Sequence, residues 1–548
     1  MTCKGALMTA SVATWMTLAM VPGVARADDM SAMRAQLDQL TAMMKTMQQQ
    51  QADLERRLAE SEAARKAMAQ AQPVPVQAPS APAASSAEAA VQPSARPLSP
   101  SAPQRAATDA PGVPPGTIAP NPYFAAQARG KGARFTIPGL DTTLTFGGML
   151  KMDAAMDLSG ANLNGWPTDA VAIPIKGTSQ AARKGNLAFT ARQTRFGFGS
   201  ETPTAWGPLK SQIELDFYGT AGNALLTNPV SPRLRQAWFS LGDVLVGQSW
   251  SVFMDLEAAA ETLDMTGPVG AAYAMRQPLI RYQRKLGQHG LLTLGIENPE
   301  GDFLGADHTS NIPIGSIMST RVLNDMPDFT ARYTYKGEGF RISAAGVLRH
   351  INLDTGGASL PFVGPNGPFA FAGQASTWGG GAQLNLTVDT FGKDSLTLSA
   401  NGGPGLGRYV MGVQDTAFLT GVAPNGSSNA NPGNGAVLGP DGKLRTIFTY
   451  GGVASYKHFW SKTLRSNLVL GYLRMNNPDK MLPLNFIEEE ATLHANLIWS
   501  PLPQVGFGVE FIHGYLGLRG QTDANRALGY GDHGVMNRLQ FSAQYNLF

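Results

Sequence analysis

The stretch Val535–Phe548, VMNRLQFSAQYNLF, decides the fold class. Its side chains alternate between an apolar set, Leu539, Phe541, Ala543 and Tyr545, and a polar set, Arg538, Gln540, Ser542, Gln544 and Asn546. Alternation with a period of two predicts a β-strand with one apolar and one polar face. Soluble proteins rarely leave such a strand on a sheet edge, because exposed edges aggregate. In a membrane barrel the last strand pairs with the first and its apolar face meets lipid, so this stretch predicts the closing strand of a barrel.

Short alternating runs fill the chain from Leu140 onward and supply the other strands. Sixteen candidate strands begin near residues 142, 194, 210, 233, 244, 279, 291, 329, 340, 378, 395, 444, 464, 489, 505 and 535. The connections alternate between tight turns and long loops, the long ones at 159–187, 251–278, 298–328, 351–377, 402–443 and 476–488. Short periplasmic turns and long external loops are typical of outer-membrane barrels, which have an even number of strands. The sequence therefore predicts an all-β, antiparallel, sixteen-stranded transmembrane barrel, because a soluble sandwich or propeller does not explain this alternation.

The region before the barrel divides into three predicted segments. Residues 1–27 have a positive flank, an apolar stretch and a small-residue cleavage site, which indicate a secretory signal peptide. Residues 28–70 repeat apolar positions in heptads and predict a coiled-coil stalk, with a single amphipathic surface helix as the alternative. Residues 71–134 form a Pro/Ala/Ser-rich linker, and the barrel covers 135–548. Because the linker enters on the short-turn side, we expect the N-terminal extension in the periplasm and the barrel in the outer membrane of a Gram-negative cell.

Composition narrows the function. Only 15% of the residues are charged, compared with about a quarter in ordinary globular proteins, and 43 basic residues face 40 acidic ones, which gives no indication of a nucleic-acid partner. No apolar run outside the signal region is long enough for a transmembrane helix. The seven histidines are dispersed, with no HExxH or GxSxG motif, so we expect neither an enzyme nor a cofactor.

Strand parity identifies candidate residues of the lumen. A charge on the lipid face costs about 2–4 kcal/mol at the membrane midplane, so the polar face of each strand is the lumen face. This rule points five basic side chains inward: Lys151, Arg195, Arg281, Arg332 and Arg341. Both parities are mixed in RLRQAWFSL, which leaves Arg233 and Arg235 unassigned.

The third long connection, residues 251–278, is the candidate constriction loop. It contains a helix-like run with four acidic side chains: Asp255, Glu257, Glu261 and Asp264. In sixteen-stranded porins the third loop folds into the pore, where these acids would face the basic wall. Rings of Arg or Lys favour anions. The alternative is that the charges are ordinary solvated side chains or ion pairs that contribute little.

Three quoted stretches carry a family resemblance. PGLDTTLTFGGMLKMDAAMDLSG, ARQTRFGFGSETPTAWGPLKSQIELDFYG and RLRQAWFSLGDVLVGQSWSVFMDLEAAAETLDMTGPVG, followed by RQPLIRY, resemble the DcaP-like porins of Gram-negative bacteria. The resemblance is strong over residues 135–282 and looser beyond. It implies a homotrimeric sixteen-stranded channel with a coiled-coil extension that takes up dicarboxylates and aromatic acids.

These observations predict a passive outer-membrane channel for small anionic solutes, which functions as a trimer in the lipid bilayer. Two alternatives remain: a general or cation-preferring porin, since acidic residues also have lumen parity, and a structural tether or adhesin whose stalk contacts the cell wall.

One detail of the closing strand also needs an explanation. Tyr545 and Phe548 have opposite parity, which predicts a bulge or a frayed residue near Leu547.

Overall fold

The computed structural model describes residues 133–137, 139–160, 170–219, 231–272, 275–301, 323–364, 367–412, 435–482 and 484–547. All of them belong to one compact unit of the chain, Thr108–Phe548. The predicted signal peptide, the stalk and residues 71–132 of the linker lie outside the described residues. Among the residues described, no helix is both long and apolar enough to cross a membrane.

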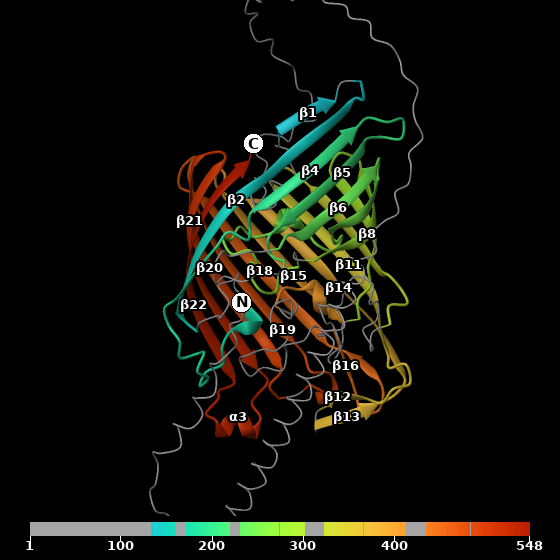
Figure 1. The fold of residues 1–548 in the computed structure, drawn as a ribbon, viewed down its shortest axis with the longest axis vertical. Coiled ribbons are helices and arrows are strands. Elements are labelled where there is room, and N and C mark those ends of the chain that lie inside the picture. The colour runs from blue at the N-terminus through green and yellow to red at the C-terminus, as the bar shows by residue number, and fades with distance from the viewer. Residues whose placement is uncertain are drawn as a thin grey trace, which may run out of the picture. The chain divides into compact units, whose positions relative to one another are not determined.

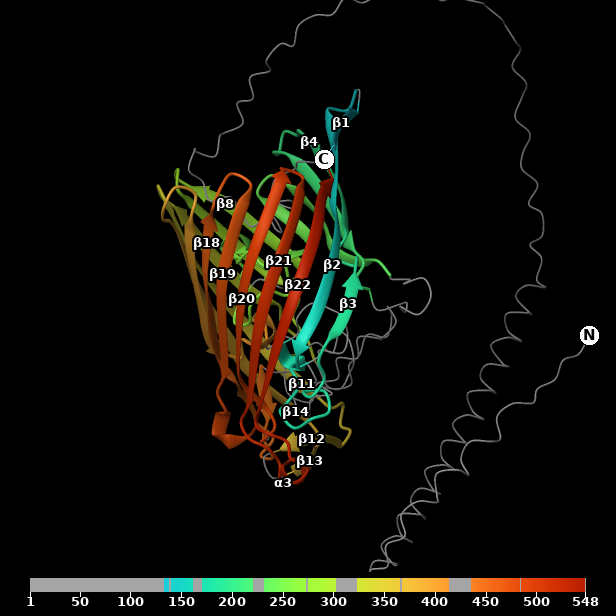
Figure 2. The ribbon, with the colours of Figure 1, turned by 90° about the vertical axis from the view of Figure 1, so that its left-hand side faces the viewer.

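The described residues form a closed antiparallel barrel with sixteen strand positions (Figures 1 and 2). The strands in order are β2 (Thr142–Ser159), β4 (Arg195–Thr202), β5 (Leu209–Asp216), β6 (Arg233–Leu241), β7 (Val244–Trp250), β8 (Arg276–Leu286), β9 (Gly290–Glu297), β10 (Asp328–Lys336), β11 (Phe340–Asp354), β14 (Gln374–Asp389), β15 (Ser395–Pro404), β18 (Phe448–Phe459), β19 (Leu464–Met475), β20 (Ile487–Leu502), β21 (Val505–Leu518) and β22 (His533–Leu547). Each strand pairs with the next, and β22 returns to pair with β2. The predicted barrel is therefore confirmed, and each predicted stretch contains a strand of the barrel; in the stretch predicted from residue 444 the barrel strand begins at Phe448.

Two short strands join the sheet without widening the ring. β1 (Ala133–Ile137) pairs with the first residues of β2, on the edge that β22 occupies further along, where Gly148 is paired with Leu547. β3 (Asn186–Thr190) pairs with β2 from Asp153 to Asp157, beyond the point where β4 begins at Arg195. β1 and β3 pair with parts of β2 that β22 and β4 do not pair with. They therefore add no strand to the ring, which keeps sixteen strands.

The closing strand has the predicted faces. Leu539, Phe541 and Tyr545 are exposed on the outside, whereas Gln540 and Ser542 are buried inside the barrel. The pairing of β22 with β2 runs without a register shift through Leu547, and the shift in this pair lies at the other end, between Asp157 and Ser159. The bulge predicted near Leu547 is therefore wrong, because the ladder to β2 holds this residue in register; Phe548 lies outside the described residues.

The two ends of the barrel differ as predicted. β6 and β7 are joined by Gly242 and Asp243 alone, and Gly242 has a positive φ of 55°, which a two-residue hairpin of this hand requires. The opposite end has long connections with elements of their own: the hairpin of β12 (Leu360–Gly364) and β13 (Gly367–Phe371), the pair of β16 (Ala436–Leu438) and β17 (Leu444–Thr446), the helix α3 (Asp523–Ala527), and the 3₁₀ turns η1 (Ala170–Ala172), η3 (Gly407–Tyr409) and η4 (Pro478–Lys480). Figure 1 shows β13 and α3 together at that end.

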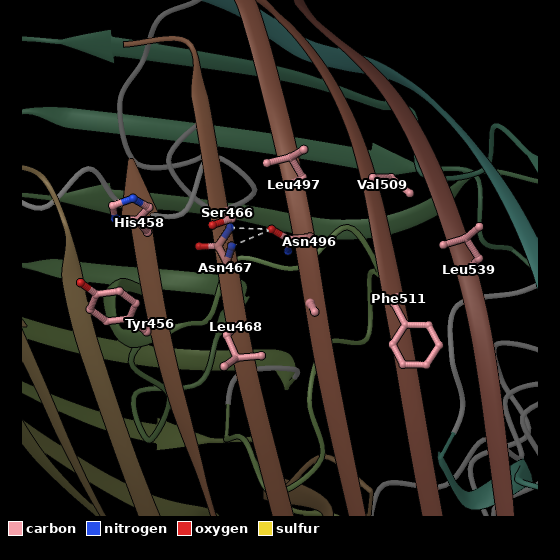
Figure 3. Close-up of a pocket in the computed structure, with 11 residues that line it drawn as sticks. Tyr456, His458, Ser466, Asn467, Leu468, Asn496, Leu497, Val509, Phe511 and Leu539 are labelled. Carbon is pink, nitrogen blue, oxygen red and sulfur yellow. Dashed lines mark hydrogen bonds between the residues drawn. The ribbon is translucent and has the colours of Figure 1, made fainter. Parts of the chain in front are cut away.

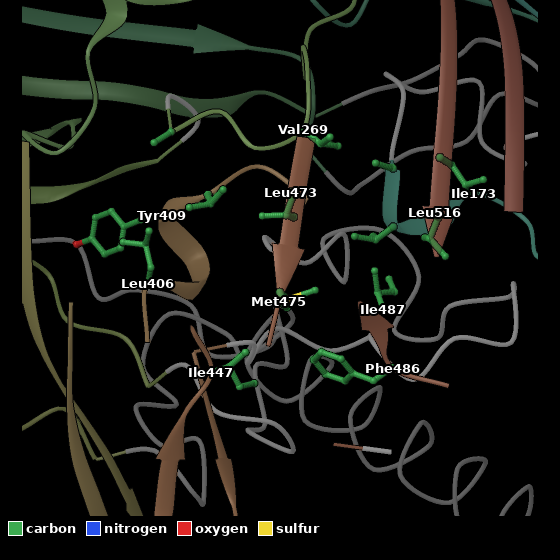
Figure 4. Packing of buried hydrophobic residues seen from close by; sticks show 14 of the residues in the cluster. Ile173, Val269, Leu406, Tyr409, Ile447, Leu473, Met475, Phe486, Ile487 and Leu516 are labelled. Carbon is green, nitrogen blue, oxygen red and sulfur yellow. The ribbon is translucent and has the colours of Figure 1, made fainter. Parts of the chain in front are cut away.

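Buried apolar side chains from several long connections meet inside the long-loop end (Figure 4). Ile173, Val269, Leu406, Tyr409 and Phe486 belong to this cluster, although they come from four different connections. A packed apolar cluster leaves no room for water, so this part of the interior is closed.

The outer wall carries a groove of about 410 Å³ (Figure 3). Leu468, Leu497, Phe511 and Leu539 line it, and each of these side chains is exposed on the outer face of its strand. The groove is therefore separate from the lumen, where the candidate site lies.

Candidate functional site: the inner loop and the charged barrel wall

In the connection between β7 and β8, the described residues 251–272 and 275 lie inside the barrel and form the inner loop. It begins against β9, where the Val252 amide donates a 2.7 Å hydrogen bond to Glu297 Oε1. Its next anchor is on β11: Asp255 accepts hydrogen bonds from Arg341 Nη1 at 2.5 Å and Nη2 at 2.8 Å, and a further one from Ser343. A bidentate guanidinium–carboxylate contact is the strongest form of ion pair between side chains.

The middle of the loop reaches strands on the other side of the ring. Glu261 is 2.9 Å from Lys457 Nζ on β18 and 2.7 Å from Arg465 Nη2 on β19. Burial alone would raise the pKa of Glu261, but these two cations outweigh it and hold the pKa at about 2. In the same way, burial opposes the effect of Arg341 on Asp255, and the pKa of Asp255 is lowered to about 2. Both carboxyls are therefore ionised at neutral pH.

The tip of the loop is held through its backbone. Lys151 on β2 donates a 2.7 Å hydrogen bond to the Leu263 carbonyl. The amides of Leu263 and Asp264 donate to Glu510 on β21, at 2.8 and 3.2 Å. Glu510 is fully buried and also accepts a 2.9 Å hydrogen bond from Asn496 Nδ2. This acid therefore acts as an anchor of the loop.

The returning part of the loop lies close to the wall at Gly270. This residue has a φ of +74°, and a Cβ there would lie 2.0 Å from the Tyr472 carbonyl oxygen and 2.9 Å from the Gly452 amide nitrogen. Asn401 donates a 2.7 Å hydrogen bond to the Gly270 carbonyl. Because only glycine fits this conformation and this space, Gly270 lets the loop lie directly on the sheet.

The predicted helix-like run is much shorter than expected. Helical structure is limited to η2, the 3₁₀ turn Leu256–Ala258, with Asp255 as its N-cap. The backbone is extended again at Ala259. A helix this short has little intrinsic stability, and its acids are drawn to opposite walls by Arg341 and Arg465, so tertiary ion pairs override the local preference.

The four loop acids have different surroundings. Asp255 and Glu261 are buried against basic wall residues. The side chain of Glu257 is 59% exposed, although it lies 3.1 Å from Arg341 Nε. Asp264 is buried and accepts a 2.8 Å hydrogen bond from the Thr266 amide, so part of its role is local.

The five predicted wall residues also separate into groups. Lys151 and Arg341 bind the inner loop directly. Arg195 on β4 is buried and lies opposite Asp216 on β5. Arg281 on β8 and Arg332 on β10 each bury an Nε atom that has no hydrogen-bond partner. Neither of these two forms an ion pair with a residue that the structure describes.

A β-bulge settles the two residues whose parity was unassigned. Glu214 pairs with Gln236 but the next residue, Leu215, pairs with Leu234, so Arg235 is the extra residue in β6. Arg233 and Arg235 thus both reach Asp216, at 2.7 and 2.9 Å, and Arg235 also contacts Glu214 at 2.5 Å. The mixed parity of RLRQAWFSL was the signal for this bulge.

Sequence reasoning also missed three other side chains near the inner loop. Lys457 and Arg465 have the inward parity of their strands and contact Glu261, so strand parity could have identified them. Trp250, the last residue of β7, lies between two guanidinium groups: Arg276 is 4.6 Å and Arg235 is 5.8 Å from the ring centroid. Only the fold brings Trp250, Arg235 and Arg276 together. In the part of the chain that the structure describes, no group of three or more His, Cys, Asp or Glu side chains could hold a metal ion.

A sixteen-stranded barrel with an inward-folded third loop and a charged lumen has the architecture of an outer-membrane porin. Residues 126–355 match the family described as DcaP outer membrane protein. This is the family that the sequence motifs of residues 135–282 resemble.

Three solved structures of outer-membrane proteins are similar to the chain, and the first of them supports the fold. The outer membrane channel DcaP of Acinetobacter baumannii has a TM-score of 0.56 and 18% identity, over 76% of this chain and 100% of that chain. The anion-selective porin from Comamonas acidovorans has a TM-score of 0.43 and 12% identity, over 74% and 100%. Salmonella typhi OmpF with daunomycin has a TM-score of 0.44 and 12% identity, over 76% and 100%. No curated protein matches the chain.

Proposed function

We propose that this outer-membrane channel mediates passive uptake of small anionic solutes such as dicarboxylates or aromatic acids, with the inner loop as its constriction. The observation that supports this is that two basic side chains of the lumen wall form no ion pair among the described residues, whereas the acidic side chains of the wall are engaged. Arg281 and Arg332 lie on the lumen wall without an ion-pair partner among the described residues. A guanidinium in this state attracts a carboxylate, which it binds in bidentate geometry.

The acidic residues that would favour cations are already engaged. Six acids with lumen parity each contact donors or cations of the protein: Asp153 with Lys151, Asp157 with Arg538, Glu214 and Asp216 with Arg235, Glu297 with the Val252 amide, and Glu510 with the Leu263 amide. In the four acids that pair with Lys151, Arg538 or Arg235, the partner charge cancels most of the long-range field of the carboxylate, whereas Glu297 and Glu510 are held by neutral amides. The cation-preferring alternative therefore has less support than the anionic one.

Ion selectivity tests the proposal directly. The purified protein would be inserted in a planar bilayer with a salt gradient, and the sign of the reversal potential would be measured. We expect an anion-preferring sign, and we expect a dicarboxylate to reduce the chloride current by occupying the lumen. A cation-preferring sign would refute the proposal, and a closed pore together with normal solute uptake in a deletion strain would favour the tether or adhesin.

We also propose that the protein functions as a homotrimer through the wall formed by β4–β7. These strands have eight, eight, nine and seven residues, compared with sixteen, fourteen and fifteen in β20–β22. A strand needs about 9–11 residues to cross the hydrocarbon core. Where a strand is shorter, the adjoining backbone N–H and C=O groups lie in the hydrocarbon core without hydrogen-bond partners, because lipid offers none. A second copy of the chain that covers β4–β7 would shield these backbone groups from lipid.

Cross-linking tests this interface. Ile213 on β5 and Leu497 on β20 are exposed to a similar degree on the outer face, at 50% and 43%. With a flexible bis-maleimide in membranes, Ile213→Cys should yield cross-linked copies. Leu497→Cys, on the long strand β20, is the matched control. Equal cross-linking of both variants would contradict the assignment.

Deletion of residues 28–70 would test whether the predicted stalk assists assembly or contacts the cell wall. Trimer content on native gels measures assembly, and co-sedimentation with peptidoglycan measures contact with the cell wall.

A further inference from the structure

A second segment reaches the base of the inner loop from the long-loop end: residues 406–411, which follow β15 and include η3 (Gly407–Tyr409). Tyr409 is fully buried in the apolar cluster shown in Figure 4. Its ring meets Phe253 of the inner loop edge to face, with 5.6 Å between centroids. Such an aromatic pair contributes beyond the burial of its area.

The Tyr409 hydroxyl joins a hydrogen-bond chain that ends at the inner loop. It donates to Asp328 Oδ2 at 2.8 Å and accepts from Gln277 Nε2 at 3.0 Å. Gln277 also donates to Glu297 Oε2 at 2.5 Å, and Glu297 Oε1 accepts the 2.7 Å bond from the Val252 amide. The hydroxyl is thus two side chains away from the first turn of the inner loop.

The backbone of the same segment binds the returning end of the inner loop. The Gly270 amide donates to the Met411 carbonyl at 2.9 Å, and the Met411 amide donates to the Ala271 carbonyl at 2.8 Å. The segment therefore contacts the inner loop near both its beginning and its end. Removal of a side chain that fixes this segment would loosen both contacts together.

We propose that Tyr409 is a positioning residue for the constriction: it locks residues 406–411 against the inner loop, so that an external connection sets the place of the loop in the lumen. This inference rests on the proposed role of the inner loop as the constriction. Tyr409 acts through Phe253, Gln277 and Met411 and does not itself contact solute. The contacts between wall and loop tip, such as Glu510 with Leu263, are independent of it.

Cysteine labelling tests the position of the loop without reference to ion selectivity. The only native cysteine is Cys3, so Cys3→Ser provides a thiol-free background. Ala271 is 2% exposed, and a thiol at Ala271→Cys should be protected from a water-soluble maleimide. We expect labelling to accelerate about tenfold with Tyr409→Phe, which keeps the ring and loses two hydrogen bonds, and about 100-fold with Tyr409→Ala, because labelling of a buried site follows local opening.

A matched control and a second readout complete the test. Tyr450→Ala removes an exposed tyrosine from the outer face of β18 and should leave labelling unchanged. In bilayers, Tyr409→Ala should increase open-channel noise and lower the voltage at which the channel closes. If Tyr409→Ala does not assemble, Tyr409→Phe decides; wild-type labelling and noise in Tyr409→Phe would then overturn the proposal. A cation-preferring wild-type channel would refute the proposed function, whereas the labelling result would still stand.

Discussion

Replacement of Asp255 by Asn removes one negative charge from the inner loop with almost no change of shape. The Asn side chain can still accept the 3.2 Å hydrogen bond from the Glu257 amide that caps η2. The bidentate contact with Arg341 is lost, although Glu257 stays 3.1 Å from Arg341 Nε. Because Arg341 keeps this partner, we expect a loss of about 1–3 kcal/mol, below the 3–5 kcal/mol of a fully orphaned buried charge.

The effect on selectivity follows from electrostatics. A unit charge about 6 Å from a permeating ion, at an effective dielectric constant of about 40, changes the energy of that ion by about 1.4 kcal/mol. Screening at about 0.1 M salt reduces this to roughly half. Asp255→Asn should therefore raise the anion-to-cation permeability ratio by about threefold to tenfold.

Reversal potentials in a salt gradient measure this ratio. Asp243→Asn is the control, because it removes the same charge from a short turn where Asp243 is 53% exposed and 4.0 Å from Arg284. This variant should shift the ratio very little. If Asp255→Asn and Asp243→Asn gave the same reversal potential, Asp255 would not lie beside the ion path, and the assignment of the inner loop as the constriction would be wrong.

Three further predictions concern charges in the lumen and at the barrel seam. Arg281→Gln should lower anion preference about threefold, with the exposed Arg284→Gln as control; an unchanged ratio would place Arg281 away from the path. The pKa values of Asp255 and Glu261 are lowered to about 2, so the stability that they supply is complete above about pH 5–6 and is lost progressively as the pH falls towards 2. Thermal unfolding should show this loss in wild type and not in the double variant with Asn and Gln at these positions; parallel curves would refute it. Arg538→Leu removes the 2.7 Å partner of Asp157 where β22 meets β2 but leaves the 3.2 Å hydrogen bond from Asn186, and should destabilise the barrel by about 1–3 kcal/mol in a heat-modifiability assay; an unchanged transition would contradict this.

Periodicity predicted the barrel because lipid imposes a simple local rule. Each strand must turn apolar side chains outward at every second position, so Leu539, Phe541 and Tyr545 identify the outer face from the sequence alone. The same rule placed Lys151 and Arg341 inside. It left Arg233 and Arg235 unassigned, because the bulge at Arg235 changes the parity within β6. The bulge predicted near Leu547 is absent, because pairing with Gly148 keeps the regular register.

The amino-acid sequence by itself determined the sixteen strands, their faces, the alternation of short and long connections, and the acidic content of the inner loop. Only the tertiary structure decided where that loop lies and which charges remain without an ion-pair partner. The partners of Asp255 and Glu261 are Arg341, Lys457 and Arg465, which are far away in sequence and come close only when the ring closes. Alternation is a local property of a strand, whereas these contacts depend on how the loop crosses a closed barrel, and no period in the sequence encodes that path.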